Sequence, residues 1–360
     1  MKITSFQKAD YQKALLNWFQ KNKRDMPWRR TRDPYAIWIS EVMLQQTQVI
    51  SVIPYYNRFL KAFPTIETLA GADLQKVLKV WEGLGYYARA RNLQKAAKII
   101  VAQFKGKFPD NPQEVAKLPG IGRYTMGAIL SIAFGKSIPV LDGNAARVLS
   151  RLLLFEEPVT KPQAKEKLWA AAEILIPDKE PAQYNQALME LGAVVCTPKT
   201  PLCGKCPLQP FCRANFMGRQ AEIPVREKRK KVPYYHVSAG IIWRDGKILI
   251  TLRPTNKMLG GLWEFPGGKC EEGESYEECL LREVAEELSI RIKVEAHVLD
   301  VRHAYTHFKI TLHTYRCKFM AGEPVLAGAD DFRWVAPEEL LQLPFPGADV
   351  KVIREILRSS

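Results

Sequence analysis

The sequence has no long uninterrupted apolar segment. No window approaches the roughly 18 consecutive apolar residues of a membrane-spanning helix. Charged residues interrupt the apolar ones in the N-terminal stretch MKITSFQKADYQKALLNWF, so it lacks the apolar core of a secretory signal peptide. Internal repeats and low-complexity tracts are absent as well. We therefore expect a cytoplasmic protein of ordinary globular composition, with no membrane partner.

Acidic residues are too few to balance the basic ones. The chain of 360 residues has 53 Lys and Arg against 38 Asp and Glu, a net charge of +15 at pH 7. Such an excess favours a polyanionic partner, and nucleic acid is the first candidate. The length allows two domains of conventional size.

Alternating apolar and polar residues are scarce in residues 1–218, whereas apolar residues recur there at steps of three and four. This pattern predicts an all-α domain. Residues 219–232 form a basic, proline-containing linker without an apolar face. In residues 233–360, HVSAGIIWRDGKILITLR predicts a hairpin around Asp245-Gly246, and an acidic helix follows at 276–288. The fold class is therefore multidomain, an all-α domain followed by an α+β domain, each with its own core.

Disulfides are not expected for the seven cysteines of a cytoplasmic chain. Four of them, Cys196, Cys203, Cys206 and Cys212, lie within the single segment 196–212. A four-cysteine zinc site usually has two Cys-x-x-Cys pairs, and this segment has one, so we expect a four-iron four-sulfur cluster. We interpret Cys270, Cys279 and Cys317 as scattered, ordinary buried residues; they are not expected to bind metal.

A glycine-rich turn lies between two predicted helices at Leu118-Pro119-Gly120-Ile121-Gly122. Its glycines allow the backbone to approach a phosphate, and the free N–H groups at the following helix start can bind that phosphate. A plain turn between helices is the alternative. Asp142 follows about twenty residues later, at another predicted helix start, and the cysteine segment follows that.

The order of hairpin, aspartate and cysteine segment resembles the helix-hairpin-helix DNA glycosylase superfamily and, within it, the adenine DNA glycosylases of the MutY family. The segments ISEVMLQQTQV, LPGIGRYTMGAILSIAFG and VLDGNAARVLSRL carry the resemblance. It implies removal of adenine mispaired with 8-oxoguanine or guanine in double-stranded DNA, by a nucleoid-associated protein acting as a monomer. Related lyases have a nucleophilic lysine at the position of Tyr124, so the resemblance implies hydrolysis without a Schiff base.

Hydrolysis of an N-glycosidic bond needs one carboxyl to protonate the base and an ionised one to face the sugar cation. Glu41 lies in the apolar stretch 36–44, where burial favours its protonated form. Asp142 lies at a helix start, where N–H groups favour the charged form; the family mechanism implies a transient covalent bond there. A solvent-facing glutamate and a plain N-cap are the alternatives.

The resemblance also implies further site residues. Asn144 joins Glu41, Asp142 and Tyr124 in the catalytic group. The adenine pocket is formed by Trp28, Arg29, Leu44 and Gln186. Residues Gln46, Thr47, Leu84 and Tyr86 wedge beside the lesion, and glycines around the last two predict an exposed loop. In the second domain Tyr305, Thr306 and His307 resemble the family's Phe-Ser-His loop that detects 8-oxoguanine, with tyrosine and threonine substituted.

The resemblance implies that residues 233–360 form a Nudix-like domain that recognises 8-oxoguanine. One segment departs from the family. Gly268, Glu274 and the run from Arg282 to Glu287 reproduce most of a Nudix box, whereas adenine glycosylases usually keep the Nudix fold but lose these residues. Glu286 and Glu287 follow Glu283 by three and four residues, a spacing that places all three on one helical face. We expect their oxygens to bind Mg²⁺ weakly. A solvated acidic helix is the alternative. The near-complete box leaves open a nucleotide-sanitising Nudix hydrolase tethered to DNA by the helical domain. A non-catalytic DNA-damage binding protein is a further alternative.

Overall fold

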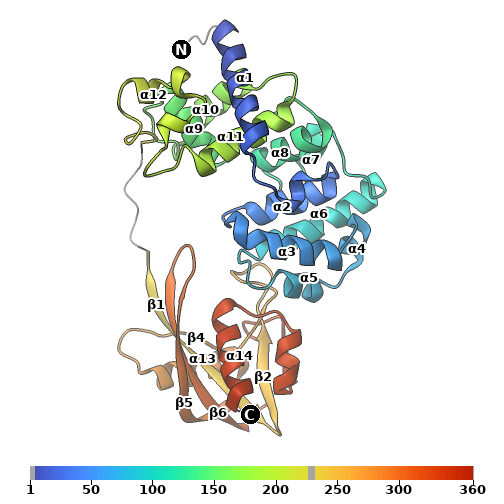
Figure 1. Ribbon diagram of the computed structural model, residues 1–360. Helices are drawn as coiled ribbons and strands as arrows, with labels where there is room; N and C mark the ends of the chain where they lie inside the picture. The colour runs from blue at the N-terminus through green and yellow to red at the C-terminus, as the bar shows by residue number, and fades with distance from the viewer. Residues whose placement is uncertain (1–4, 226–231, 360) are drawn as a thin grey trace. The chain divides into compact units, whose positions relative to one another are not determined.

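The protein is described by a computed structural model that covers residues 5–225 and 232–359 (Figure 1). Its contacts divide the chain into two compact units, Met1–Leu60 with Ala96–Arg229 and Lys61–Lys95 with Lys230–Ser360. The segment Lys61–Lys95 thus groups with the C-terminal half, although its helical pattern assigned it to the first domain. The boundaries 1–218 and 233–360 stay a prediction, and residues 226–231 of the predicted linker lie outside the described residues.

The first unit is built from helices, as the sequence predicts. They are α1 (Ser5–Asn22), η1 (Pro27–Arg29), α2 (Pro34–Leu44), α3 (Val49–Ala62), α6 (Ala88–Phe104), α7 (Pro112–Val115), α8 (Arg123–Phe134), α9 (Gly143–Leu153), α10 (Pro162–Leu175), α11 (Pro181–Val194), η2 (Cys203–Lys205), η3 (Gln209–Phe211) and α12 (Arg213–Phe216). Helices α3 and α6 continue into the segment that groups with the second unit. None of the described helices is long and apolar enough to cross a membrane.

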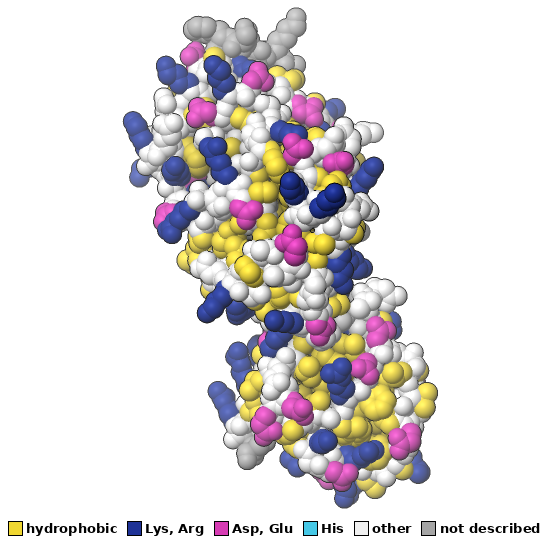
Figure 2. Space-filling view, turned by 90° about the vertical axis from the view of Figure 1, so that its right-hand side faces the viewer, with side chains coloured by type: hydrophobic (Ala, Val, Ile, Leu, Met, Phe, Trp, Pro, Cys, Tyr) yellow, Lys and Arg dark blue, Asp and Glu magenta, His cyan; other side chains and the backbone are white. Residues whose placement is uncertain are grey.

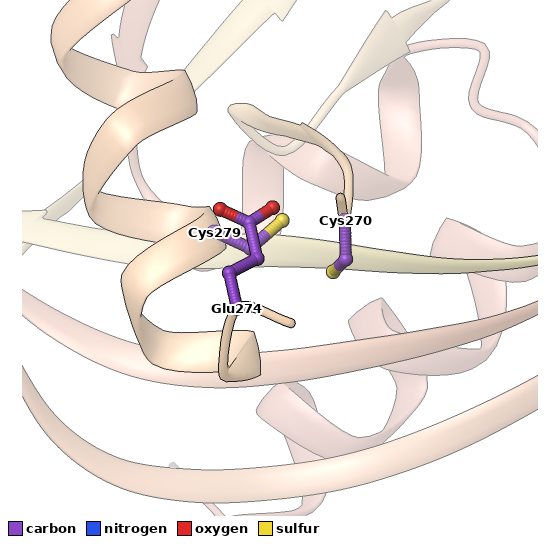
Figure 3. A group of neighbouring side chains, drawn as sticks. All are labelled: Cys270, Glu274 and Cys279. Atoms are coloured by element: carbon purple, nitrogen blue, oxygen red, sulfur yellow. The ribbon is translucent and has the colours of Figure 1, made fainter. Parts of the chain in front are cut away.

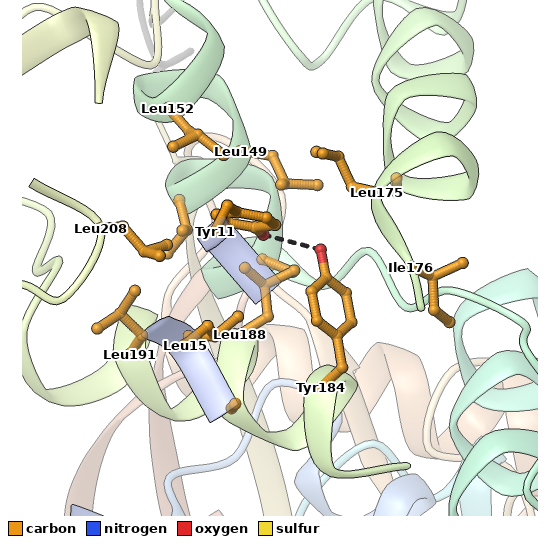
Figure 4. Packing of buried hydrophobic residues seen from close by; sticks show 14 of the residues in the cluster. Tyr11, Leu15, Leu149, Leu152, Leu175, Ile176, Tyr184, Leu188, Leu191 and Leu208 are labelled. Carbon is orange, nitrogen blue, oxygen red and sulfur yellow. Dashed lines mark hydrogen bonds between the residues drawn. The ribbon is translucent and has the colours of Figure 1, made fainter. Parts of the chain in front are cut away.

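The core of the first unit lies between α1, α9, α10 and α11 (Figure 4). Leucines from these helices fill it, and the hydroxyls of Tyr11 and Tyr184 hydrogen bond to each other inside it at 2.8 Å. Pairing these two hydroxyls satisfies polar groups that would be costly to bury alone. The result is a rigid support for the N-terminal ends of α9 and α11.

The second unit contains α4 (Ile66–Gly71), α5 (Leu74–Trp81) and a seven-stranded mixed sheet. Its strands are β1 (Tyr234–Arg244), β2 (Lys247–Leu252), β3 (Trp263–Glu264), β4 (Gly267–Lys269), β5 (Arg291–Ala304), β6 (Lys309–Ala321) and β7 (Asp331–Val335). The central order is β3-β2-β1-β6-β5, with β4 paired to β1 and β7 to β2; among these described strands only β1 and β6 run parallel. Asp245 and Gly246 have positive φ of 50° and 74°, which confirms the predicted hairpin.

Helices cover both faces of the sheet. Successive side chains of β1 point to opposite faces, so neighbouring residues pack against different helices. Ile241 packs with α14 (Gly347–Ser359) in one cluster, whereas Ile242 packs with α13 (Tyr276–Leu288) in another. A short η4 (Pro337–Gln342) precedes α14. Helix α13 has the predicted bounds and begins at the capping box of Ser275 and Glu278. The predicted α+β architecture is confirmed.

The prediction for the three remaining cysteines was partly wrong. Cys279 and Cys317 are buried as expected, but Cys270 is only partly buried. Cys270 and Cys279 are also not scattered, because their sulfurs lie within 4.8 Å of each other. The loop between β4 and α13 folds back on the helix, a contact that spacing along the chain does not reveal.

Candidate active site

A cavity of ≈ 690 Å³ in the first unit brings together most of the predicted site residues. It lies among α2, α8, α9 and α11 and the turns that precede α8 and α9. The predicted residues that line it are Trp28, Arg29, Glu41, Leu44, Gln46, Thr47, Gly120, Gly122, Tyr124, Asp142, Asn144 and Gln186. Leu118 is buried under the hairpin and does not line the cavity.

Glu41 is held in the wall of this cavity by α2, whose residues 35–43 are all buried. Asp33 caps this helix by accepting hydrogen bonds from the backbone N–H groups of Tyr35 and Ala36. Only 4% of Glu41 is exposed, and the Tyr124 hydroxyl donates a hydrogen bond to its Oε2 at 2.6 Å. Burial raises the pKa of Glu41 to about 7, because an ionised carboxylate loses its hydration there. The alternative of a solvent-facing Glu41 is excluded.

Asp142 is the N-cap of α9 and accepts hydrogen bonds from the backbone N–H of Ala145 at 2.7 Å and from Asn144 Nδ2 at 3.0 Å. The sequence predicted that such donors would favour its charged form. They do oppose protonation, but burial outweighs them and raises the pKa of Asp142 above its ordinary value. The prediction was wrong in the direction of the shift. Asp142 still accepts two hydrogen bonds as a cap, against the single one that Glu41 accepts from Tyr124.

Sequence reasoning missed Glu190, which also lines the cavity. This buried carboxylate of α11 accepts hydrogen bonds from Arg29 Nη2 at 2.9 Å and from Arg24 Nε at 2.6 Å. Charge-assisted pairs of this kind fix both guanidinium groups, and they hold Arg29 at the cavity wall. Glu190 follows the predicted Gln186 by four residues, and residues four apart lie on the same face of a helix. This spacing could have indicated that Glu190 also faces the cavity.

The glycine-rich turn joins α7 to α8 as a helix-hairpin-helix. Gly120 adopts a left-handed φ of 78°, and Gly122 is the N-cap of α8 with no side-chain cap. Gly120 and Gly122 are both exposed, and a Cβ on Gly122 would meet nothing within 4 Å.

The four predicted cluster ligands, Cys196, Cys203, Cys206 and Cys212, line one cavity of ≈ 30 Å³ after α11. Arg151 of α9 holds this segment in place by donating to Cys196 Sγ at 3.3 Å and to the carbonyl of Thr197 at 2.7 Å. Four cysteine sulfurs around one small cavity are a ligand set suited to a metal centre.

The predicted wedge residues Leu84 and Tyr86 lie in the second unit. Leu84 is only 7% exposed, so the prediction that it projects from an exposed loop was wrong for this structure. Tyr86 has a left-handed φ of 49°, and its hydroxyl hydrogen bonds to Thr306. Within this unit, a cavity of ≈ 550 Å³ is lined by Tyr86, Tyr305, Thr306 and His307. The structure thus gathers four of the residues expected to contact the opposite base.

The glutamates of α13 do not converge as the predicted magnesium site requires. Among the described residues, the carboxylates of Glu283, Glu286 and Glu287 do not all lie within 4.8 Å of one another. Arg282 pairs with Glu283 at 2.8 Å and with Glu286 at 3.4 Å. Burial raises the pKa of Glu287. Two carboxylates paired with a guanidinium and a third with a raised pKa are a poor site for a hard cation.

Comparisons with known proteins agree with this architecture. Residues 39–173 match the HhH-GPD superfamily of base excision DNA repair proteins, and residues 238–355 match the NUDIX domain. The structure defines a helix-hairpin-helix repair protein with a C-terminal Nudix domain. The adenine DNA glycosylase of Homo sapiens is 34% identical over 95% of this chain and 73% of its own length. That of Buchnera aphidicola subsp. Schizaphis graminum is 41% identical over 71% of this chain and 74% of its own. The chain belongs to the adenine DNA glycosylase family.

Solved structures confirm the fold of the helical half. A thermostable thymine-DNA glycosylase is 28% identical with a TM-score of 0.53, and covers 58% of this chain and 97% of its own. An endonuclease III in a non-covalent DNA complex has a TM-score of 0.51 over 60% of this chain and 99% of its own. At 24% identity the second likeness concerns the fold alone.

Proposed function

We propose that this chain removes adenine mispaired with 8-oxoguanine or guanine from duplex DNA, by hydrolysing the N-glycosidic bond. The observation that carries the proposal is the meeting of Glu41, Tyr124 and Asp142 in one cavity beside a helix-hairpin-helix turn. Membership of the adenine DNA glycosylase family supports it. A non-catalytic DNA-binding protein would not need a buried acid with a raised pKa at this position.

The substrate base has to leave the helical stack before Glu41 can reach it. The cavity of ≈ 690 Å³ is large enough for one purine, and Trp28 supplies an aromatic wall. Arg29, held by Glu190, offers fixed donors to the nitrogen atoms of the base. Leu44 and Gln186 complete the pocket on α2 and α11.

Glu41 acts as the general acid. Since its Oε2 accepts the Tyr124 hydrogen bond, Oε1 is the oxygen that carries the transferable proton. The proton passes to a ring nitrogen of adenine, the C1′–N9 bond breaks, and its electron pair leaves with the base. With a pKa of about 7, this carboxyl is protonated in a large fraction of molecules at neutral pH, as an acid catalyst must be.

Asp142 stabilises the sugar cation that bond cleavage leaves behind. Its hydrogen bonds from Ala145 and Asn144 hold the carboxylate in place and favour its ionised form, against the effect of burial. Water then adds to C1′, and the Glu41 carboxylate takes up the released proton. Tyr124 has no amine, so no Schiff base forms and the DNA strand is left uncut.

The remaining parts position the DNA. The N–H groups at the start of α8 bind a phosphate on one strand. A four-iron four-sulfur cluster would be held by Cys196, Cys203, Cys206 and Cys212, and it would fix the 196–212 loop. Burial and repulsion between the thiolates raise the pKa of the free Cys206 thiol to about 12. Four thiolates at this place therefore need a cationic centre to neutralise them. A monomer bound to nucleoid DNA in the cytoplasm is the expected state. Lys and Arg side chains are spread over the face shown in Figure 2, interspersed with acidic ones.

The second unit is proposed to recognise 8-oxoguanine through Tyr305, Thr306 and His307. They share a cavity with Tyr86 inside that unit, where Tyr305 offers a ring for stacking and Thr306 a hydroxyl for hydrogen bonding. The Nudix segment of the same unit is a second candidate site. Because its three glutamates do not converge, we propose that it binds Mg²⁺ weakly and hydrolyses nucleotides little.

The test uses purified protein and four duplexes, with adenine opposite 8-oxoguanine, guanine or thymine, and thymine opposite guanine. Abasic sites are revealed by alkaline strand cleavage. The proposal expects excision of adenine, fastest opposite 8-oxoguanine, and intact strands when alkali is omitted. Excision of thymine instead of adenine, or strand cleavage without alkali, would contradict it.

A further inference from the structure

Three side chains with metal-binding atoms meet in the second unit, apart from the cysteine segment of the first. Cys270 follows β4, Glu274 lies in the loop before α13, and Cys279 lies near the start of α13. One ligand atom of each lies within 4.8 Å of the other two. Figure 3 shows the three side chains next to one another between the helix and the loop.

We propose that Cys270, Glu274 and Cys279 bind one zinc ion through two thiolate sulfurs and a carboxylate oxygen. For Zn–S bonds of about 2.3 Å and Zn–O bonds of about 2.0–2.2 Å in a tetrahedron, ligand atoms lie roughly 3.4–3.8 Å apart. The observed separations are within 4.8 Å, so small side-chain rotations complete the geometry. Water takes the fourth position, since Cys270 and Glu274 are only partly buried.

Glu274 is already oriented by its own hydrogen bonds. Arg282 donates to both carboxylate oxygens, through Nη2 to Oε1 at 2.7 Å and Nε to Oε2 at 3.1 Å. The backbone N–H of Glu271 donates to Oε1 at 2.6 Å. Such outer partners fix ligating carboxylates in metal sites. Oε2 accepts only one of these three hydrogen bonds, and the Cys279 thiol also hydrogen bonds to the carboxylate, so zinc would replace the thiol proton in that contact.

Zinc offsets most of the negative charge that its three ligands carry when it binds. Two thiols each lose a proton, and the resulting pair of thiolates with the carboxylate carries three negative charges. Zinc supplies two positive charges, and Arg282, which pairs with Glu274 as well as with Glu283 and Glu286, lies beside the remaining negative charge. The two protons are released to solvent, which makes binding stronger as the pH rises.

The ligand set selects zinc over the magnesium expected for a Nudix segment. Thiolates prefer soft or borderline ions, whereas Mg²⁺ prefers oxygen ligands. The trio is separate from Cys196, Cys203, Cys206 and Cys212, which line a cavity of the first unit. Zinc bound here joins the loop after β4 to the first turns of α13. This contact would hold Gly268 against Glu283, whose carboxylate leaves no room for a Cβ.

The test uses the full chain with its iron content measured, reduced and then incubated with Zn²⁺ and desalted. Zinc and iron per chain are measured together in wild type, Cys270→Ser, Glu274→Gln and Cys317→Ala. We expect one zinc per wild-type chain, loss of that zinc in Cys270→Ser with iron unchanged, and at least tenfold weaker retention against a competing chelator in Glu274→Gln. Cys317→Ala, which removes a thiol outside the trio, should keep the zinc.

X-ray absorption at the zinc edge provides a second measurement that does not depend on a variant folding. Two sulfurs and two lighter atoms around zinc would support the proposal. Three results would overturn it: zinc uptake by Cys270→Ser equal to wild type, a shell of four sulfurs, or no zinc uptake by the reduced wild-type chain. Because Cys270 is partly exposed, its substitution leaves the buried core unchanged. The comparison of zinc content between Cys270→Ser and wild type is therefore the decisive one.

Discussion

The stability of the first unit should depend on pH through Glu41. Its pKa is about 7 in the folded chain, against an ordinary value of 4.5. A carboxyl with a raised folded-state pKa contributes stability that is fully present below its unfolded pKa and is lost as the pH rises through its folded pKa. The relevant window therefore runs from about pH 4.5 to pH 7 and slightly above.

The magnitude follows from the linkage relation at 1.36 kcal/mol per pKa unit. For pKa values of 4.5 and about 7, the ionisation of Glu41 lowers the free energy of unfolding by about 1 kcal/mol at pH 5 and by about 3 kcal/mol at pH 8. The amide introduced by the substitution Glu41→Gln cannot ionise. The stability of the variant relative to wild type should thus increase by about 2 kcal/mol from pH 5 to pH 8.

The assay is urea-dependent hydrogen exchange of peptides from α8 and α9, measured at several pH values, because these helices report on the first unit alone. Other titrating groups are common to both proteins and cancel in the difference. Glu323→Gln, which changes an exposed glutamate, is the matched control. Its difference in stability from wild type should stay the same at every pH. A difference between Glu41→Gln and wild type that stays constant within about 0.5 kcal/mol would show that Glu41 ionises normally, and would remove the physical basis for its role as the acid.

Four other outcomes are expected. Cys203→Ser should lose most of its iron and its affinity for duplex DNA, measured by metal analysis and by binding titration; stoichiometric zinc and no iron in the wild-type protein would contradict the cluster. Borohydride should trap no covalent DNA adduct, because Tyr124 has no amine; a trapped adduct would reveal a lyase. Tyr305→Ala should reduce the preference for 8-oxoguanine over guanine about 5- to 150-fold, as expected from about 1–3 kcal/mol of stacking, and an unchanged preference would exclude Tyr305 from recognition. As a check on the Nudix segment, the full chain with Mg²⁺ should release pyrophosphate from 8-oxo-dGTP far more slowly than about 1 per second. Faster turnover would show that the chain is also a nucleotide hydrolase.

Local signals in the sequence predicted the elements that local physics determines. The Asp245-Gly246 turn needs two residues with positive φ, and α13 begins at the capping box of Ser275. Asp142 caps α9 as expected. Each of these structures depends on residues within one or two turns, so its pattern is visible in the sequence.

Features that depend on distant contacts were not predictable in the same way. Glu190 meets Arg29 across 161 positions of the chain, and Leu84 is buried by packing that its flanking glycines do not show. The pKa of Asp142 rises because the folded unit buries it, an effect that outweighs the local hydrogen bonds foreseen at the helix start. Cys270 lies beside Cys279 because a loop folds back onto α13.

Single-turnover excision of adenine opposite 8-oxoguanine, compared between wild type, Glu41→Gln and Glu323→Gln, is the most direct test of the central claim. Duplex binding is measured in parallel for each protein. The account predicts that Glu41→Gln binds the duplex like wild type but excises adenine at least roughly 10²-fold more slowly, because the amide keeps the shape and has no acidic proton. Glu323→Gln should match wild type. Excision by Glu41→Gln within about tenfold of wild type would show that Glu41 is not the acid.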